Sequence, residues 1–276
     1  MKRTRIIFTV LLFVVGCGED PMNVKRTSHP SLADISHSAW EKLSTRKIFF
    51  GHQSVGFNII EGIQDLMKEN HQIKLPIVET HDPADFNQPI FAHSTVGKNQ
   101  DPLSKIDVFV SLMDRGLGSQ IDIAFFKFCY VDITSSTDID QVFSHYERTL
   151  SSLQKKYPET TFIHFTVPLT TLQSGIKAMI KRILGKSIGS EDNMQREQFN
   201  KKLRKAYWEQ GTLFDLAKAE STSPAGKITT FTINGETCIY LNPEYTYDGG
   251  HLNEMGRVKV AGQFLTFLAI LSEKMS

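Results

Sequence analysis

The loop around His251 contains the residue types of an acid–base pair. Asp248 precedes His251 by three residues in a Gly-rich segment, and an apolar helical pattern follows. A histidine in this setting can take a proton from a nucleophile, while the carboxylate holds the ring and stabilises the imidazolium ion. Asp-x-x-His is a weak signal by itself, so the prediction depends on a nucleophile elsewhere in the chain.

Ser54 is the candidate nucleophile. It lies in Gly51-His52-Gln53-Ser54, between an apolar run with strand character (Lys47–Phe50) and a helical pattern near Ile59–Glu69. A strand, turn and helix in this order place the hydroxyl group beside a helix N-terminus, where free backbone N–H groups favour a developing oxyanion. The alternative, equally open from these residues alone, is that Ser54 only caps the helix.

Together the two segments resemble the SGNH (GDSL-type) hydrolases, a family of serine esterases and lipases. The resemblance runs from Lys47 to about Leu271 and is most specific at Asp248–Gly256. It implies that Ser54 is the nucleophile, His251 the general base and Asp248 the partner that orients the histidine. Gly51-His52-Gln53-Ser54 departs from the family's usual Gly-Asp-Ser, which makes this chain an atypical member. The implied chemistry needs no metal or organic cofactor.

The resemblance also implies an oxyanion hole built from the serine N–H, a glycine N–H and an asparagine side chain. Gly97, ahead of a predicted helix at Leu103–Met113, is the expected glycine. Where the family has Gly-x-Asn-Asp, this chain reads Cys129-Tyr130-Val131-Asp132, so Val131 replaces the asparagine. Losing one oxyanion donor typically costs about 10²–10³ in rate. A slow enzyme, or a glycan-binding or scaffold protein that has lost its chemistry, is therefore an alternative.

Two further residues are candidates for the oxyanion or substrate site. Asn99, two residues after Gly97, offers a replacement amide, although asparagine is also a common turn residue. His52, two residues before Ser54, is expected either to contact the substrate or oxyanion or to pack inside the fold.

The N-terminus resembles a bacterial lipoprotein signal peptide over residues 1–16. Three cationic residues precede an apolar run that is too short for a membrane span, and the run ends in Val14-Val15-Gly16-Cys17. This pattern predicts cleavage before Cys17, lipid on its thiol, a tether over residues 17–38 and a hydrolase domain over residues 39–276. The expected location is the bacterial cell envelope, with a lipid anchor in the membrane. Location alone suggests an acyl ester on a glycan or lipid as substrate.

The composition is that of an ordinary globular domain. The chain has 276 residues, of which 40% are hydrophobic and 22% charged, so it can bury a large core without disulfides. A formal net charge of +1 gives no electrostatic support for nucleic-acid binding. No spacing suggests a metal site, and Cys129 and Cys238 are predicted to be unpaired thiols. The oligomeric state stays open.

Alternating strand and helix patterns predict an α/β fold with a mostly parallel central sheet in three α/β/α layers, SGNH-hydrolase or flavodoxin-like. The predicted strands are Lys47–Phe50, Ile73–Glu79, Ile123–Tyr130, Thr161–Val167 and Thr212–Leu216. The predicted helices include Asp138–Lys156, an insertion at Ile176–Leu184, Phe199–Tyr207 and the helix after His251. Lys227–Ile233 and Glu236–Leu241, joined at Asn234-Gly235, predict a β-hairpin that either walls the pocket or extends the sheet edge.

The sequence thus predicts a serine esterase that forms an acyl-enzyme on Ser54. Acyl transfer to a sugar hydroxyl in place of water is a further alternative.

Overall fold

A parallel five-stranded sheet lies at the centre of the fold. The computed structural model describes residues 31–173 and 189–275, and the sheet has the strand order β2-β3-β1-β4-β5. Its strands are β1 (Lys47–His52), β2 (Ile77–Glu79), β3 (Ile90–Thr95), β4 (Ile123–Phe126) and β5 (Thr161–Phe162). The chain builds β2 and β3 on one side of β1 and then returns to build β4 and β5 on the other. Ligands of open α/β sheets bind beyond the carboxyl ends of the strands at such a reversal.

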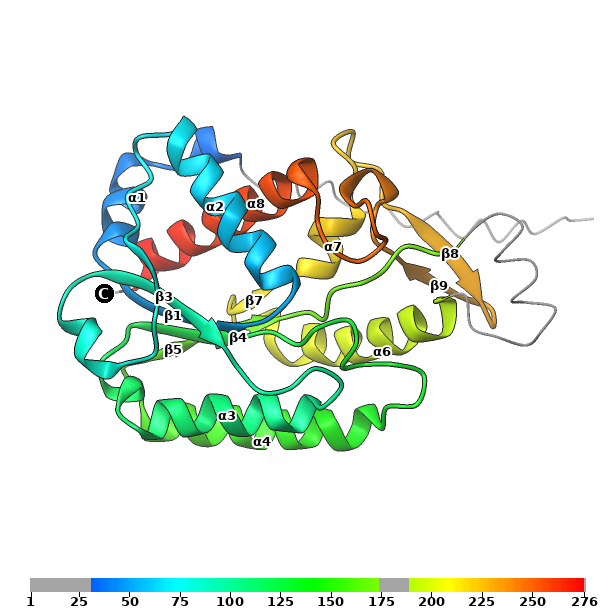
Figure 1. Cartoon of the computed structure of the whole chain (residues 1–276), viewed down its shortest axis with the longest axis horizontal. Helices are drawn as coiled ribbons and strands as arrows, with labels where there is room; N and C mark the ends of the chain where they lie inside the picture. Colours follow the sequence, from blue (N-terminus) through cyan, green and yellow to red (C-terminus); the bar gives the residue numbers. More distant parts are fainter. Residues whose placement is uncertain (1–30, 174–188, 276) are drawn as a thin grey trace, which may run out of the picture.

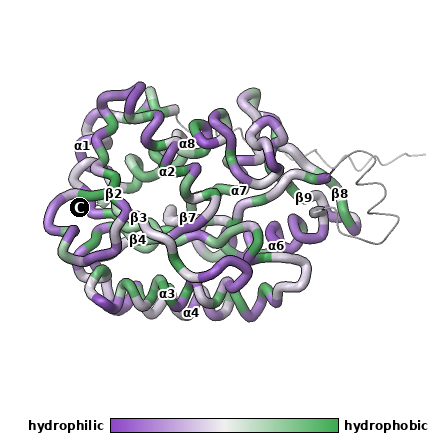
Figure 2. Tube along the Cα trace, in the orientation of Figure 1, coloured by the Kyte–Doolittle hydropathy of each residue, from purple (hydrophilic) through white to green (hydrophobic). Residues whose placement is uncertain are grey.

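Helices cover both faces of the sheet (Figure 1). One face carries α1 (His37–Ser44), α2 (Val55–Glu69), α7 (Leu216–Ser221) and α8 (Glu254–Lys274); the other carries α3 (Pro102–Asp114), α4 (Ile139–Lys156) and α6 (Ser190–Tyr207). Along β1, Ile48 and Phe50 are buried in the cluster that contains α2 and α8, whereas Phe49 is buried in the cluster that contains α3 and α4. This alternation follows from the two-residue repeat of a strand. Figure 2 shows hydrophobic and hydrophilic residues alternating along α3 and α4, as in amphipathic helices.

The fold class predicted from the sequence is confirmed, but one central strand was missed. The predicted strands did not include Ile90–Thr95, which forms β3 and pairs with both β1 and β2. His93 and Ser94 interrupt its apolar pattern, yet both are buried. The predicted strand Ile73–Glu79 is also too long: the chain turns at Ile73, whose N–H donates to Asn70, and β2 begins at Ile77.

The predicted strand Thr161–Val167 is divided because its partner changes. β5 pairs with β4, whereas β6 (His164–Phe165) pairs with β7 (Leu213–Phe214). The helix predicted at Phe199–Tyr207 begins earlier, at Ser190, and α1 begins inside the expected tether, at His37. The signal peptide, Cys17 and the predicted helix at Ile176–Leu184 lie outside the described residues.

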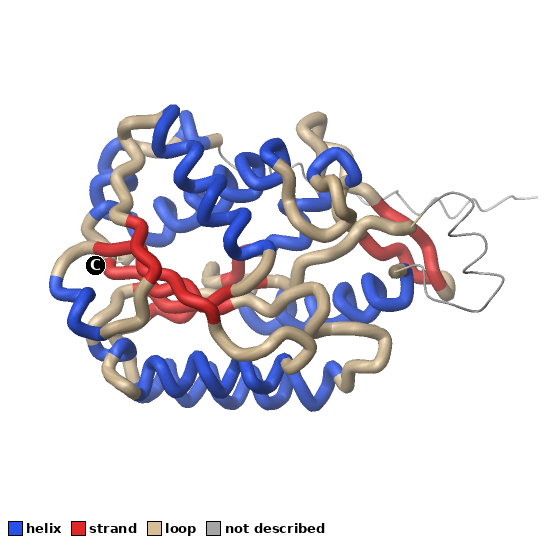
Figure 3. The backbone as a smooth tube through the Cα atoms, in the orientation of Figure 1, coloured by secondary structure: helices blue, strands red, loops and turns tan. Residues whose placement is uncertain are grey.

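The predicted hairpin is present but lies in a place that neither alternative foresaw. β8 (Thr230–Ile233) and β9 (Glu236–Ile239) form a separate two-stranded sheet that packs on α6, away from the central strands (Figure 3). Asn234 and Gly235 have φ angles of 51° and 81°. Two successive positive φ angles characterise a type I′ turn, for which Asn-Gly is the preferred sequence.

Both cysteines of the described domain, Cys129 and Cys238, are buried and unpaired, as predicted. In residues 31–173 and 189–275, no helix is both long and apolar enough to cross a bilayer. The same part of the chain contains no group of three or more histidine, cysteine, aspartate or glutamate side chains that could hold a metal ion.

Candidate active site

Ser54, His251 and Asp248 form a continuous hydrogen-bonded series. The Ser54 Oγ atom lies 2.8 Å from Nε2 of His251, and Nδ1 of the same ring lies 2.6 Å from Oδ2 of Asp248. The serine follows β1 and the other two residues precede α8, so the fold joins segments 197 residues apart. A second contact fixes their register, because the Leu252 N–H donates to the side chain of Asn58 on α2.

The backbone of Ser54 is held in a conformation that L-residues rarely adopt. Its φ and ψ angles are 55° and −118°, in the sharp turn between β1 and α2. Such strain at a non-glycine residue persists only where the surroundings impose it, and it is concentrated at functional sites. The Ser54 side chain makes no capping hydrogen bond to α2. The alternative that Ser54 serves only as a helix cap therefore finds no support in its contacts.

The Asp248 carboxylate is fixed by its own loop. Its Oδ1 atom accepts hydrogen bonds from the N–H groups of Gly250 and His251, each at 2.8 Å, and from the hydroxyl group of Thr246 at 3.2 Å. Partial burial raises the pKa of Asp248, but the hydrogen bonds from the His251 ring and the two N–H groups outweigh it and hold the pKa well below its usual range. The carboxylate is therefore charged and aimed at the histidine. Both side chains are about half exposed, at 57% for Asp248 and 44% for His251.

Gly97 lies two residues after the end of β3 and contacts Gln53, the residue before Ser54. Pairing of β1 with β3 sets His52 opposite Thr95, and the Gln53 side chain donates to the carbonyl of Gly97 at 2.7 Å. Gly97 has φ 61°, and a Cβ atom there would lie 2.6 Å from Lys105, so only glycine fits this turn. Among the described residues, no group accepts a hydrogen bond from the N–H of Ser54 or of Gly97. Both donors are available to an oxyanion.

The structure does not bring Asn99 or His52 to the triad. Asn99 is exposed, and its side-chain oxygen accepts a hydrogen bond from Lys105 at 3.0 Å. His52 is completely buried, with Nε2 3.1 Å from Nδ1 of His93. Burial, with a smaller contribution from the charge of Lys127, lowers the pKa of His52 to about 2, so this ring is neutral. Its position fits the packing alternative and not substrate contact.

A buried ion pair joins the two loops on the oxyanion side. Lys105 Nζ lies 2.5 Å from Oδ2 of Asp132, and neither side chain has any exposed surface. Asp132 also accepts hydrogen bonds from the N–H groups of Cys129 and Gln100. The carboxylate thereby ties the segment after β3 to the segment after β4. Asp132 is thus a structural link between these two segments.

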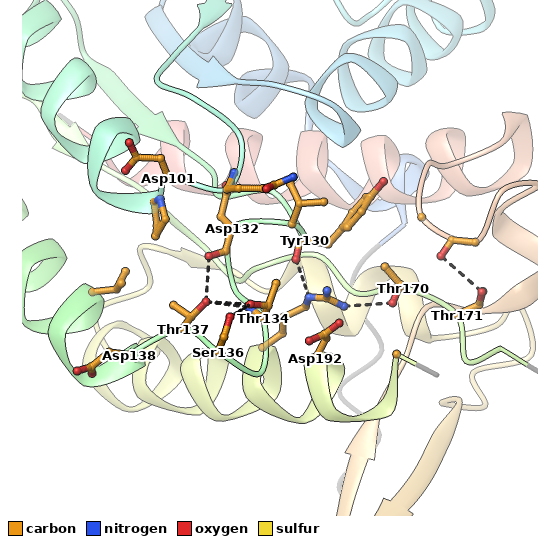
Figure 4. A pocket seen from close by; sticks show the side chains of 18 of the residues that line it. Asp101, Tyr130, Asp132, Thr134, Ser136, Thr137, Asp138, Thr170, Thr171 and Asp192 are labelled. Carbon is orange, nitrogen blue, oxygen red and sulfur yellow. Dashed lines mark hydrogen bonds between the residues drawn. The ribbon is translucent and has the colours of Figure 1, made fainter. Parts of the chain in front are cut away.

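A cavity of about 840 Å³ borders the triad at Asp248. The loop Asp248–Gly250 and Tyr130 form part of its edge, and hydroxyl side chains lie on two of its sides (Figure 4). The labelled hydroxyl residues are Thr134, Ser136, Thr137, Thr170 and Thr171. Arg196 of α6 contributes to the lining, and its guanidinium donates to the carbonyl groups of Tyr130 and Ile133 and to the hydroxyl group of Thr170.

Sequence reasoning missed Tyr130, Arg196 and Asn58 as parts of this site. The signal for Tyr130 was its place in Cys129-Tyr130-Val131-Asp132, at the position that the family motif leaves free. Arg196 was not recognised because it is one of several basic residues of α6, and the sequence does not show that it is buried. Nothing in the sequence distinguishes Asn58 from an ordinary helix-surface residue.

No family model matches this chain, and no curated protein matches it significantly. Several solved structures are similar. A structure described as a platelet activating factor from Streptococcus pneumonia is 14% identical with a TM-score of 0.48, covering 86% of this chain and 94% of its own. The periplasmic domain of a lipopolysaccharide acetyltransferase from Salmonella ser. Paratyphi A is 13% identical, with a TM-score of 0.44 and coverages of 85% and 98%.

A third similar structure is described as a lipolytic protein of the G-D-S-L family, from Desulfitobacterium hafniense DCB-2. It is 7% identical with a TM-score of 0.44, and the alignment covers 80% of this chain and 99% of the other. Likenesses of this size do not establish a shared activity.

Proposed function

We propose that this chain is a serine hydrolase that cleaves an ester-linked acyl group through an acyl-enzyme on Ser54. The observation that carries the proposal is the hydrogen-bonded series from Ser54 through His251 to Asp248, with distances of 2.8 and 2.6 Å. A nucleophile within hydrogen-bonding reach of a base that a third group orients is the geometry of covalent catalysis.

In the first half-reaction, the Ser54 oxygen attacks the ester carbonyl carbon and its proton passes to Nε2 of His251. The former carbonyl oxygen becomes an oxyanion, to which the N–H groups of Ser54 and Gly97 donate hydrogen bonds. The intermediate collapses, and the departing alkoxide takes the proton from His251. In the second half-reaction, water attacks the acyl-enzyme by the same route and releases the carboxylic acid and Ser54.

The lining of the cavity favours a polyhydroxylated carrier of the acyl group, such as an envelope glycan, over a long-chain lipid. Five serine and threonine side chains line it, and the lining also includes the carboxylates of Asp101, Asp138 and Asp192. Such groups exchange hydrogen bonds with sugar hydroxyls. An acetylated oligosaccharide is expected to be turned over faster than a p-nitrophenyl ester of a long-chain fatty acid. The reverse preference would contradict this substrate class.

Acyl transfer is the second candidate function, because the triad is half exposed and borders a cavity with room for an acceptor. In this reaction a sugar hydroxyl replaces water in the second half-reaction. Incubating the enzyme with an acyl donor and an oligosaccharide, and analysing the products by mass spectrometry, separates the two. Acylated oligosaccharide indicates transfer, and free acid alone indicates hydrolysis.

The test of the proposed function is hydrolysis of p-nitrophenyl acetate by protein that lacks residues 1–16. Ser54→Ala is expected to fall to the background rate, because it removes the attacking oxygen. Ser111→Ala, on the exposed surface of α3, is the matched control and is expected to keep full activity. Wild-type activity that survives Ser54→Ala would contradict the assignment.

A non-catalytic binding protein is the alternative motivated by the missing asparagine. A fluorophosphonate probe reacts with an activated serine and leaves an inactive one unlabelled. Labelling of wild type at neutral pH, lost in both Ser54→Ala and His251→Ala, would exclude the binding-only alternative. Absence of labelling in folded wild type would favour it.

We also propose that the protein is held at the bacterial envelope by lipid on Cys17. One acyl chain gives only marginal membrane binding, whereas several chains on one cysteine hold a protein stably. The full chain is expected to partition into the detergent phase, and Cys17→Ser to lose its lipid or remain uncleaved. Recovery of the wild type without lipid would contradict the anchor and leave the hydrolase proposal intact.

A further inference from the structure

Tyr130 directly precedes Val131, the residue that stands in place of the family's asparagine. It is the first residue after Cys129 in the turn that follows β4, and Cys129 itself approaches the backbone of Gln53 with a sulfur–oxygen distance of 3.7 Å. The parallel pairing of β1 with β4 thus brings this turn next to the nucleophile. In Figure 4 the Tyr130 ring points away from the hydroxyl groups of Thr134, Ser136 and Thr137.

The phenol ring of Tyr130 contacts both members of the nucleophile–base pair. Ser54 is close enough to its hydroxyl group to lower the pKa of that group, as the smallest of several contributions. Its ring lies edge-on to the His251 ring, with the centroids 5.8 Å apart. Gly250 packs on the phenol so closely that a Cβ atom there would lie 2.9 Å from the hydroxyl oxygen. These contacts place the phenol beside the nucleophile–base pair.

Arg196 holds Tyr130 from the other side. Its Nε donates to the Tyr130 carbonyl at 2.8 Å, and its guanidinium lies over the phenol ring, 5.8 Å from the centroid. Arg196 is itself almost fully buried and is tied to Thr170 and Asn193. The tyrosine is therefore fixed before substrate arrives, as electrostatic catalysis requires of a donor.

The Tyr130 hydroxyl group keeps its proton at neutral pH. Burial raises its pKa above the usual value near 10, and the negative charge of Asp248 raises it further, against smaller opposing contributions from Arg196 and the Ser54 hydrogen bond. A phenol in this state is a donor and not a competing base for Ser54.

We propose that the Tyr130 hydroxyl group is the third donor of the oxyanion hole, in the role that the asparagine side chain plays in the family that this sequence resembles. Before reaction the Ser54 oxygen has its own proton directed at His251. When that oxygen bonds to the carbonyl carbon, the Tyr130 hydroxyl group turns about its Cζ–Oη bond and donates to the adjacent oxyanion. Tyr130 keeps its proton throughout, so no further group is needed to balance the step. This inference rests on the proposed function.

Tyr130→Phe tests the proposal, because it removes the hydroxyl group and keeps the ring. We expect kcat for p-nitrophenyl acetate to fall about 10²–10³-fold with KM nearly unchanged, as for a donor that acts only in the transition state. Labelling by a fluorophosphonate, whose phosphoryl oxygen also becomes more negative during attack, is expected to slow with it. The matched control is Tyr157→Phe, which removes a phenol bonded to Asp114 far from the site and is expected to retain full kcat.

The outcomes separate this proposal from the proposed function. A Tyr130→Phe protein with wild-type kcat, or with a loss confined to KM, would overturn the role of Tyr130 and leave Ser54 as the nucleophile. An inactive wild type would overturn the hydrolase itself. Thermal unfolding monitors the fold of each variant. Adding Val131→Asn to Tyr130→Phe supplies the family's amide, and recovery of part of the lost kcat would further support a missing donor.

Discussion

The two halves of the candidate active site are built differently. On the histidine side, Asp248 is fixed by groups within three residues of it, and the Asp248 and His251 side chains are about half exposed. On the oxyanion side, Lys105 and Asp132 form a fully buried ion pair between residues 27 positions apart. Groups that are positioned by near neighbours leave a short motif in the sequence, whereas groups that are positioned by distant contacts do not.

Removing the base is expected to give the largest effect. His251→Ala should lower kcat for p-nitrophenyl acetate about 10⁶-fold, as severely as loss of the nucleophile, because the residues of a triad act as a unit. Single-turnover kinetics measure it, with His145→Ala on exposed α4 as the control. Loss of a single oxyanion donor typically lowers the rate about 10²-fold. If His251→Ala keeps more than a hundredth of the rate, the base contributes no more to kcat than one such donor.

Breaking the buried ion pair is expected to give the largest effect on stability. Lys105→Met leaves Asp132 charged and buried without its partner, which typically costs about 3–5 kcal/mol. Lys156→Met is the control, because its pair with Asp114 is about half exposed and such pairs contribute about 0–1 kcal/mol. Urea unfolding monitored by circular dichroism measures both. Equal losses would contradict a special role for the buried link.

Asp248→Asn is expected to have a smaller effect on rate than removing His251. The amide keeps much of the shape but loses the charge that orients the ring and stabilises the imidazolium, so kcat is expected to fall by up to about 10⁴. Steady-state kinetics with the acetate ester give the result. A loss as large as that of His251→Ala would mean that the exposed carboxylate does more than orient its partner.

The pH dependence of stability is expected to show the smallest difference. Because hydrogen bonds hold the pKa of Asp248 below its usual value near 3.8, its charge contributes stability that is full above that value and is lost as the pH falls further. The stability gap between wild type and Asp248→Asn should therefore be widest at neutral pH and narrow at about pH 3. A stability gap that widens as the pH falls would contradict a stabilising contribution from the Asp248 charge. Solvent screening keeps the effect small, since the carboxylate is half exposed.

The parts predicted from the sequence are those with strong local patterns. Alternating strand and helix signals gave the α/β class, and Asn234-Gly235 gave the hairpin. The Ser54 and Asp248–His251 motifs named three residues that the structure brings together within hydrogen-bonding distance. Each of these features depends on residues within a few positions of one another.

The parts that were missed depend on long-range contacts. β3 was not predicted because His93 and Ser94 read as polar, although burial between two strands makes that segment central. Asn99 and His52 were chosen because they are close to Gly97 and Ser54 in sequence, but one is exposed and the other is sealed inside the core. Tyr130 was overlooked because its importance comes from a loop more than a hundred residues away.

The contact between Gly250 and Tyr130 implies a constraint on how such sequences diverge. Any side chain at Gly250 would meet the phenol at about 2.9 Å, closer than Cβ atoms are normally found. The sizes of the two residues are therefore coupled. A chain with tyrosine after the fourth sheet strand is expected to keep glycine directly before its histidine, whereas a chain with a small residue there is released from that requirement. This pair of positions offers a sequence signature by which other chains with the same arrangement can be recognised.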